Sequence, residues 1–154
     1  FLNTTTISST KGQRRDYSRQ QQQQQMHHDL NLHAVWDDKI IETTLSNDYH
    51  NSRNAFESSL LNLIWQARET PAWNDEWVNC ADGAEKACTS QWAEESFQNA
   101  LLYAYRNVDG TQISNGADLS SAYYDRSLPI VRKQLALAGV RLAATLEARL
   151  GHPV

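Results

Sequence analysis

Residues 121–149 read SAYYDRSLPIVRKQLALAGVRLAATLEAR and form the longest stretch of the sequence with a helical hydrophobic pattern. Apolar side chains recur in it every three to four residues, as they do on one face of an α-helix. The apolar residues at core-compatible spacing are Tyr124, Leu128, Val131, Leu135, Leu142 and Leu146. We therefore predict a helix over 121–149. Pro129 should kink it by removing an N–H and crowding the preceding turn, and Gly139 should let another helix come close.

Three shorter segments upstream have the same periodicity and predict helices over about 29–46, 52–69 and 90–106. Asp29 is the N-cap expected for the first helix, and Thr70-Pro71 should end the second, because a residue before proline is disfavoured in the α-region. The residues expected in the core are Leu32, Val35, Trp36 and Ile40 in the first helix. In the second they are Phe56, Leu60, Leu61, Ile64 and Trp65, and in the third Trp92, Ala93, Phe97, Ala100 and Ala104. Residues 71–89 are expected to form an ordered loop pinned by Trp73 and Trp77. The sequence contains no run with strand periodicity, so the predicted fold class is all-α.

The composition is that of a globular protein. The chain has 154 residues, of which 40% are hydrophobic and 21% charged, and its formal net charge is −4. This length suits one domain or a piece of one. No apolar run approaches the roughly 20 residues of a membrane span, so we expect no membrane partner. An acidic chain also lacks the basic field with which most nucleic-acid-binding proteins meet phosphates.

Residues 1–28 differ in composition from the rest of the chain. They are rich in Thr and Ser, then basic from Lys11 to Arg19, and end in six glutamines at 20–25. Such a segment buries too little apolar area to offset its ordering entropy. We predict a low-complexity, flexible insertion over 1–28, followed by a helical part over 29–154. Asn3 begins an N-x-T sequon and is a candidate glycosylation site.

The sequence contains two cysteines, Cys80 and Cys88. Their neighbours do not have zinc-finger spacing, so a short local disulfide is favoured over two free thiols. Closing so small a loop would contribute on the order of 2.5 kcal/mol in the chain-entropy model. A disulfide would imply an oxidising compartment, and the sequon agrees with one.

His33 and Asp37 are the candidate metal ligands. Four residues apart on a predicted helix, they share one face with about 6 Å between their Cβ atoms. Nitrogen and oxygen donors on adjacent turns can converge on one zinc ion at about 2 Å. From spacing alone, a His/Asp pair on a solvated helix face is the more common interpretation.

Three strings in order along the chain strengthen the metal interpretation. The first is NLHAVWD at 31–37. The second consists of Cys88, WAEES at 92–96 and YAYRN at 103–107. The third consists of YY at 123–124, LPIV at 128–131 and GVRLA at 139–143. These strings resemble the S1/P1 nuclease family, and most closely its plant-type bifunctional members. The family motifs are N-L-H-x-x-W-D, C-x-x-x-[YW]-A-x-E-S and Y-[YF]-x-x-x-L-P-I-V…G-G-x-R-L-A. Ala138 replaces the first glycine of the last motif, and the resemblance covers about 29–149.

The resemblance implies a helical fold similar to that of zinc-dependent phospholipase C. It implies a secreted or lumenal glycoprotein with a Cys80–Cys88 pair. It also implies a hydrolase with three zinc ions that cleaves single-stranded DNA, RNA and 3′-nucleotides to 5′-phosphate products. In such an enzyme His33 and Asp37 would share one zinc ion. Metal ions would explain how an acidic protein binds phosphate.

Several family features have no counterpart in this sequence. These are an N-terminal zinc-binding tryptophan, a G-x-x-G-H segment and an H-x-x-x-D-x-x-Q-P-L-H run. We therefore expect the chain to be the C-terminal portion of such an enzyme, with no assignable catalytic residue. It should be inactive without its upstream half, and apolar surface should be exposed where that half would pack. The alternatives are a non-catalytic helical scaffold that has lost the zinc cluster and, by analogy of fold alone, a phosphodiesterase acting on phospholipid.

Three further residues have structural interpretations. Trp36 is expected to pack in the core beside the metal face. Tyr123 should be buried and Tyr124 at the surface. Arg141 is expected to be an ion-pair or capping partner in preference to a phosphate ligand.

Overall fold

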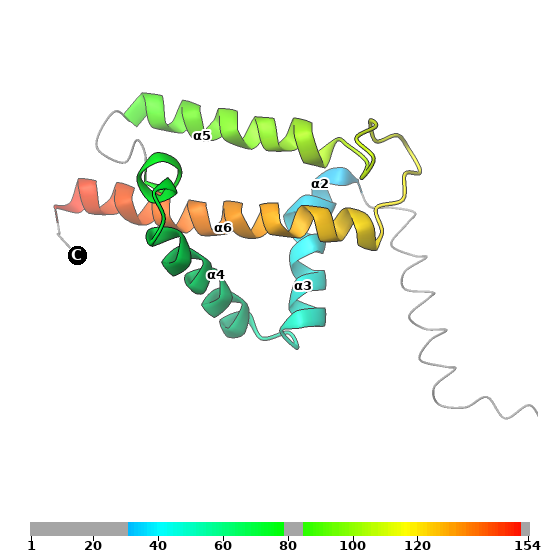
Figure 1. Cartoon of the computed structure of the whole chain (residues 1–154), viewed down its shortest axis with the longest axis horizontal. Helices are drawn as coiled ribbons and strands as arrows, with labels where there is room; N and C mark the ends of the chain where they lie inside the picture. The colour runs from blue at the N-terminus through cyan, green and yellow to red at the C-terminus, as the bar shows by residue number, and fades with distance from the viewer. Residues whose placement is uncertain (1–30, 79–84, 152–154) are drawn as a thin grey trace, which may run out of the picture.

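The computed structural model describes residues 31–78 and 85–151, and within these ranges the chain is mostly helical (Figure 1). The elements are α2 (Leu32–Ala34), η1 (Val35–Lys39), α3 (Ile40–Asp48), α4 (Arg53–Arg68), η2 (Trp73–Trp77), α5 (Glu85–Asn99), η3 (Ala100–Ala104) and α6 (Ser121–Leu150), where η marks a single π-helical turn. Outside these helices, β-type pairing in the described part is limited to an isolated bridge between Arg106 and Gln112. The predicted all-α class is confirmed.

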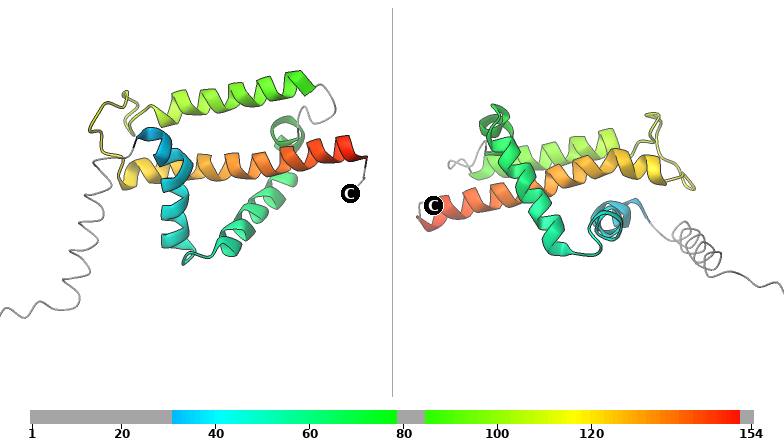
Figure 2. Two further views of the ribbon diagram at one scale, coloured as in Figure 1. Left: turned by 180° about the vertical axis from the view of Figure 1, so that it is seen from behind. Right: turned by 60° about the horizontal axis from the view of Figure 1, so that its bottom comes forward.

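The long helix α6 runs through the middle of the molecule. In Figure 1, α5 lies along one side of it, while α3 and α4 lie on the other, and the views in Figure 2 agree. The predicted helix over 121–149 is confirmed, and it continues through Pro129 without interruption. It ends at Gly151, whose left-handed backbone (φ 66°) lets its N–H bond the Glu147 carbonyl at 3.1 Å.

Two hydrophobic clusters line α6. Near its start, Tyr123 and Val131 pack against Val35 and Ile40 of the first helical segment, which we define as residues 32–48. Further along, Ala136 and Leu137 pack against Trp77 of η2 and against the partly buried side chains Leu63, Ile64, Ala67, Trp73, Val78 and Val140. Trp73 and Trp77 stack with ring centroids 6.0 Å apart. The tryptophans pin the segment after α4 as predicted, but residues 73–77 form a π-helical turn in place of the predicted loop.

The buried face of α6 differs from the prediction. Leu135, Leu142 and Leu146 were expected in the core but are exposed, whereas Ser127 and Arg141 are buried. The apolar stripe of α6 is broad, and its sequence does not show which edge the neighbouring helices will cover. In the structure they cover the edge formed by Tyr123, Ser127, Val131, Ala136, Leu137 and Arg141. The sequence predicts exposed apolar surface on this chain, and Leu135, Leu142 and Leu146 form such a surface. Among the described residues, nothing lies within 4 Å of a Cβ placed on Gly139, so the close helix contact predicted there is not made.

The same correction applies to α4 and α5. On α4, Phe56 is buried, but Leu61 and Trp65 are exposed. On α5, Ala93 and Phe97 are exposed. Periodicity identified these helices correctly but not the side on which each would find a partner. α5 also begins at Glu85, before the predicted residue 90, because Glu85, Lys86 and Ala87 favour helix and no proline interrupts them.

The connection between η3 and α6 is held by the side chain of Arg126. Its guanidinium donates to the carbonyl oxygens of Tyr103 at 2.8 Å and Asn107 at 2.6 Å, and also to that of Arg106. The three carbonyls belong to the last turn of η3 and to the residues just after it, so Arg126 acts as a side-chain cap at the end of η3. None of the helices in the described part is both long enough and apolar enough to cross a membrane.

Candidate metal site

The first helical segment begins with a capped turn that carries His33. The Asn31 side chain accepts a hydrogen bond of 2.9 Å from the backbone N–H of Ala34. Asn31 has an extended backbone, as N-cap residues do. The cap predicted at Asp29 is therefore at Asn31 in the described chain, and Asp29 itself lies outside the described residues.

Asp37 lies in the π-helical turn Val35–Lys39. The amide of Ile40 bonds the carbonyl of Val35, five residues earlier, and so closes a wider turn than an α-helix has. Single π-turns are rare and are frequently found at functional sites. Hydrophobic periodicity gave no sign of this turn, because it changes the backbone bonding without interrupting the helix.

The structure brings the two predicted ligands together. The Nε2 atom of His33 lies 2.8 Å from an Oδ atom of Asp37, and their side chains are 83% and 54% exposed. A nitrogen and an oxygen donor therefore converge on an open face. The 2.8 Å separation is that of an ion pair on a solvated helix. Two donors of one tetrahedral zinc ion, each about 2 Å from the metal, would lie about 3.3 Å apart, so this pair would have to open by about 0.5 Å to hold zinc.

The turn is anchored in the protein through Trp36. The indole N–H of Trp36 donates a 2.7 Å hydrogen bond to the hydroxyl of Tyr123, and the two rings meet edge to face. The Tyr123 hydroxyl in turn donates to the carbonyl of Ala104 at 2.8 Å. Trp36 is half-buried in the first hydrophobic cluster, as predicted, and Tyr123 is buried.

Tyr124 makes a second link between α6 and the first helical segment. Its hydroxyl lies 2.7 Å from the hydroxyl of Thr44, which donates to the Ile40 carbonyl at 2.8 Å. The surface position predicted for Tyr124 is wrong, because the residue is half-buried against α3. Burial raises the pKa of both Tyr123 and Tyr124, and the hydrogen bonds with Trp36 and Thr44 oppose this only in part.

Two donors are too few for a complete zinc site. Within 31–78 and 85–151, no group of three or more His, Cys, Asp or Glu side chains is placed to hold a metal ion. Zinc sites in proteins have four ligands, or three and a water molecule. Asn3, Cys80, His27, His28 and His152 lie outside the described residues, and Cys88 is buried in α5.

Comparison with known proteins identifies the family. The model of the S1/P1 Nuclease family matches residues 16–151. This chain belongs to the S1/P1 nuclease family. The family match begins inside the segment 1–28 that composition sets apart.

Relatives in this family include several named endonucleases. The chain is 37% identical to Endonuclease 5 of Arabidopsis thaliana over 123 residues, which cover 78% of the chain and 38% of the relative. It is 40% identical to Endonuclease 4 of the same plant, covering 75% of the chain and 36% of the relative. For Nuclease S1 of Aspergillus oryzae the identity is 31%, over 80% of the chain and 42% of the relative. The chain thus spans about two fifths of these relatives, and no solved structure matches it significantly.

Proposed function

We propose that the chain contributes two zinc ligands, His33 and Asp37, to a hydrolase of the S1/P1 type. The enzyme would cleave single-stranded DNA and RNA, and 3′-nucleotides, to 5′-phosphate products. The observation that carries this proposal is the convergence of His33 Nε2 and Asp37 Oδ at 2.8 Å on an exposed face. It occurs in a chain that belongs to a nuclease family.

The chemistry follows from what zinc supplies when it is bound. Zinc ions lower the pKa of bound water and stabilise negative charge on phosphate oxygens. His33 and Asp37 would hold one of three zinc ions in the complete site, and the metal charge would attract the phosphates that a chain of net charge −4 does not attract by itself.

We further propose that this chain alone is inactive and binds zinc weakly, because its described residues offer two donors where at least three are needed. The remaining donors would come from an upstream half, which is the partner this proposal requires. The exposed leucines Leu135, Leu142 and Leu146 of α6 agree with a second layer of protein on that side.

Secretion or residence in the lumen of the secretory pathway is also a proposal. It rests on the N-x-T sequon at Asn3 and on a disulfide between Cys80 and Cys88. Peptide mapping without reductant of protein expressed in a eukaryotic secretory host tests both modifications. A Cys80 peptide recovered with a free thiol would contradict the disulfide.

The activity is tested with a chimera that joins the upstream part of Endonuclease 5 to this chain at their aligned boundary. We expect the chimera to cleave single-stranded DNA, RNA and 3′-AMP in a chelator-sensitive manner, and this chain alone to cleave none. His33→Ala and Asp37→Asn should each lower the activity by at least 100-fold. Asp38→Asn is the matched control, because Asp38 is exposed next to Asp37 but is not paired with His33.

The outcomes separate the candidate functions. Activity of this chain alone would contradict its proposed dependence on an upstream half. A folded chimera that neither binds zinc nor cleaves nucleic acid, beside an active Endonuclease 5, would favour a non-catalytic helical scaffold. Cleavage of phosphatidylcholine in preference to nucleic acid would favour a phosphodiesterase that acts on phospholipid.

A further inference from the structure

The Tyr123 hydroxyl joins three segments that are far apart in the sequence. It accepts from the Trp36 indole in η1 and donates to the Ala104 carbonyl at the end of η3, while Tyr123 itself belongs to α6. Only 2% of Tyr123 is exposed, so water cannot replace either partner. Both functions of the hydroxyl are in use, which fixes its orientation.

Trp36 lies between the two metal ligands in the sequence. It follows His33 by three residues and precedes Asp37 by one, inside the π-helical turn. A π-turn holds one residue more than an α-turn, so relaxation to α-helical bonding would change the angle between His33 and Asp37. The Trp36–Tyr123 hydrogen bond attaches this turn to α6 and so opposes such a change.

The turn is also held by apolar packing. Val35 begins the π-turn and Ile40 follows it, and both are buried against Tyr123 and Val131. Packing of this kind fixes the depth of the turn but is not directional. A hydrogen bond is directional, so the indole bond is the contact that fixes the rotation of the turn.

We propose that Tyr123 is a positioning residue for metal binding, which acts through Trp36 to hold the imidazole of His33 and the carboxylate of Asp37 in converging orientations. The inference rests on the proposed function, because it takes His33 and Asp37 to be zinc ligands. Tyr123 does not touch the metal face. Its role is to restrict the turn, so that little rearrangement is needed when zinc binds.

The chain provides a matched control in the adjacent tyrosine. Tyr124 belongs to the same helix, is also partly buried, and contacts the same helical segment through Thr44. Its contact lies at α3, beyond the π-turn. Tyr123→Phe and Tyr124→Phe thus remove the same atom from neighbouring residues, and only the former releases Trp36.

Zinc alone, added to the full 154-residue chain, is the probe. Zinc titration followed by NMR at the imidazole of His33 measures weak binding residue by residue. We expect Tyr123→Phe to weaken zinc binding about 10-fold, which is the smallest effect typical of removing a group that orients a metal ligand. Tyr124→Phe should weaken zinc binding by less than about 3-fold. Hydrogen exchange of the Ile40 amide, measured without metal, should be faster in Tyr123→Phe than in Tyr124→Phe.

A second variant covers the case in which Tyr123→Phe does not fold. Trp36→Phe keeps an aromatic ring in the cluster and removes the indole donor, so it should weaken zinc binding similarly. Equal zinc affinities in the Tyr123 and Tyr124 variants would overturn the positioning role while leaving the proposed function intact. Absence of any zinc-dependent shift at His33 in the unaltered chain and in the chimera would overturn both.

Discussion

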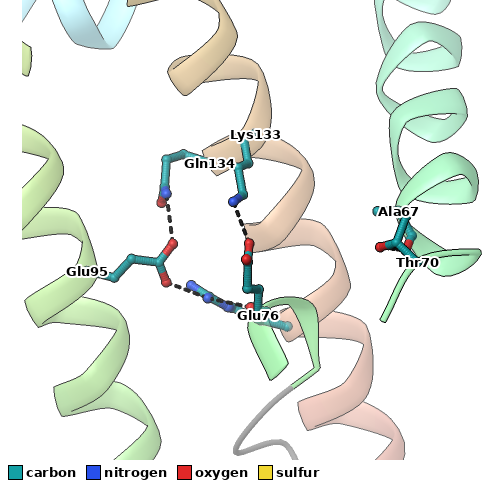
Figure 3. A network of polar contacts seen from close by, with 7 residues as sticks. Ala67, Thr70, Glu76, Glu95, Lys133 and Gln134 are labelled. Carbon is teal, nitrogen blue, oxygen red and sulfur yellow. Dashed lines mark hydrogen bonds and ion pairs between the residues drawn. The ribbon is translucent and has the colours of Figure 1, made fainter. Parts of the chain in front are cut away.

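The carboxylate of Glu95 in α5, which is labelled in Figure 3, forms an ion pair of 2.5 Å with the guanidinium of Arg141 in α6. Arg141 is buried, donates also to the Glu76 carbonyl at 3.1 Å, and lies over the ring of Trp92. Gln134 donates to the other oxygen of Glu95 at 3.0 Å. The predicted ion-pair role of Arg141 is confirmed. These hydrogen bonds join α5 to α6, whereas Ala93 and Phe97 of α5 are exposed and contribute little to this contact.

Glu95→Gln should therefore destabilise the chain by about 1–3 kcal/mol. This is less than the 3–5 kcal/mol typical of a buried pair that loses one partner, because Glu95 is partly exposed and Arg141 keeps its other contacts. Glu94→Gln is the control, since Glu94 is exposed and contacts Gln98 within its own helix. It should change stability by less than about 0.5 kcal/mol. Urea unfolding of the two variants measures the difference, and equal midpoints would contradict it.

The corrected face of α4 gives a second prediction. Phe56 is buried and meets Tyr49 edge to face with centroids 5.4 Å apart, whereas Leu61 is 55% exposed. Phe56→Ala should cost about 3–5 kcal/mol, because it removes a packed ring and leaves a cavity. Leu61→Ala should cost less than about 1 kcal/mol. A larger loss for Leu61→Ala than for Phe56→Ala in denaturant unfolding would contradict the exposed position of Leu61.

The comparison of sequence and structure shows which features periodicity can reveal. The 3.6-residue repeat located α6 to within one residue and α4 nearly as well, because a helix must bury apolar side chains at that spacing. The repeat did not identify the buried edge of a broad stripe. Leu142 and Arg141 are neighbours in α6, yet the leucine is exposed and the arginine buried. Glu95, 46 positions away, decides the burial of Arg141, and helical periodicity carries no information about such a contact.

The candidate site shows the same division between local and distant information. The pairing of His33 with Asp37 follows from i,i+4 spacing and could be predicted. The anchoring of Trp36 by Tyr123 joins residues 87 positions apart and could not. The π-turn was also missed, since no residue in VWDDK disfavours α-helical bonding in the way that proline does.

Burial of tyrosine hydroxyls gives a prediction for alkaline pH. Burial raises the pKa of Tyr123 above its ordinary value of 10.0, so the folded chain keeps a proton that the unfolded chain loses. The stabilisation linked to this proton is complete below about pH 10 and is lost as the pH rises toward the folded-state pKa. The urea midpoint should therefore fall between pH 9 and pH 11, and fall less in Tyr123→Phe. An unchanged midpoint, or an equal fall in both proteins, would contradict this linkage.

The cap at Asn31 gives a prediction for the turn that carries His33. Asn31→Ala removes the acceptor of the Ala34 amide and should cost about 1 kcal/mol. The loss should be local, since the cap is exposed and the next turns are held by Val35 and Ile40. Hydrogen exchange of the Ala34 amide should accelerate about fivefold, while that of Thr44 changes little. Asn31→Asp should restore protection, because a carboxylate caps equally well and interacts favourably with the helix dipole. Equal exchange in the alanine and aspartate variants would show that the cap does not hold this turn.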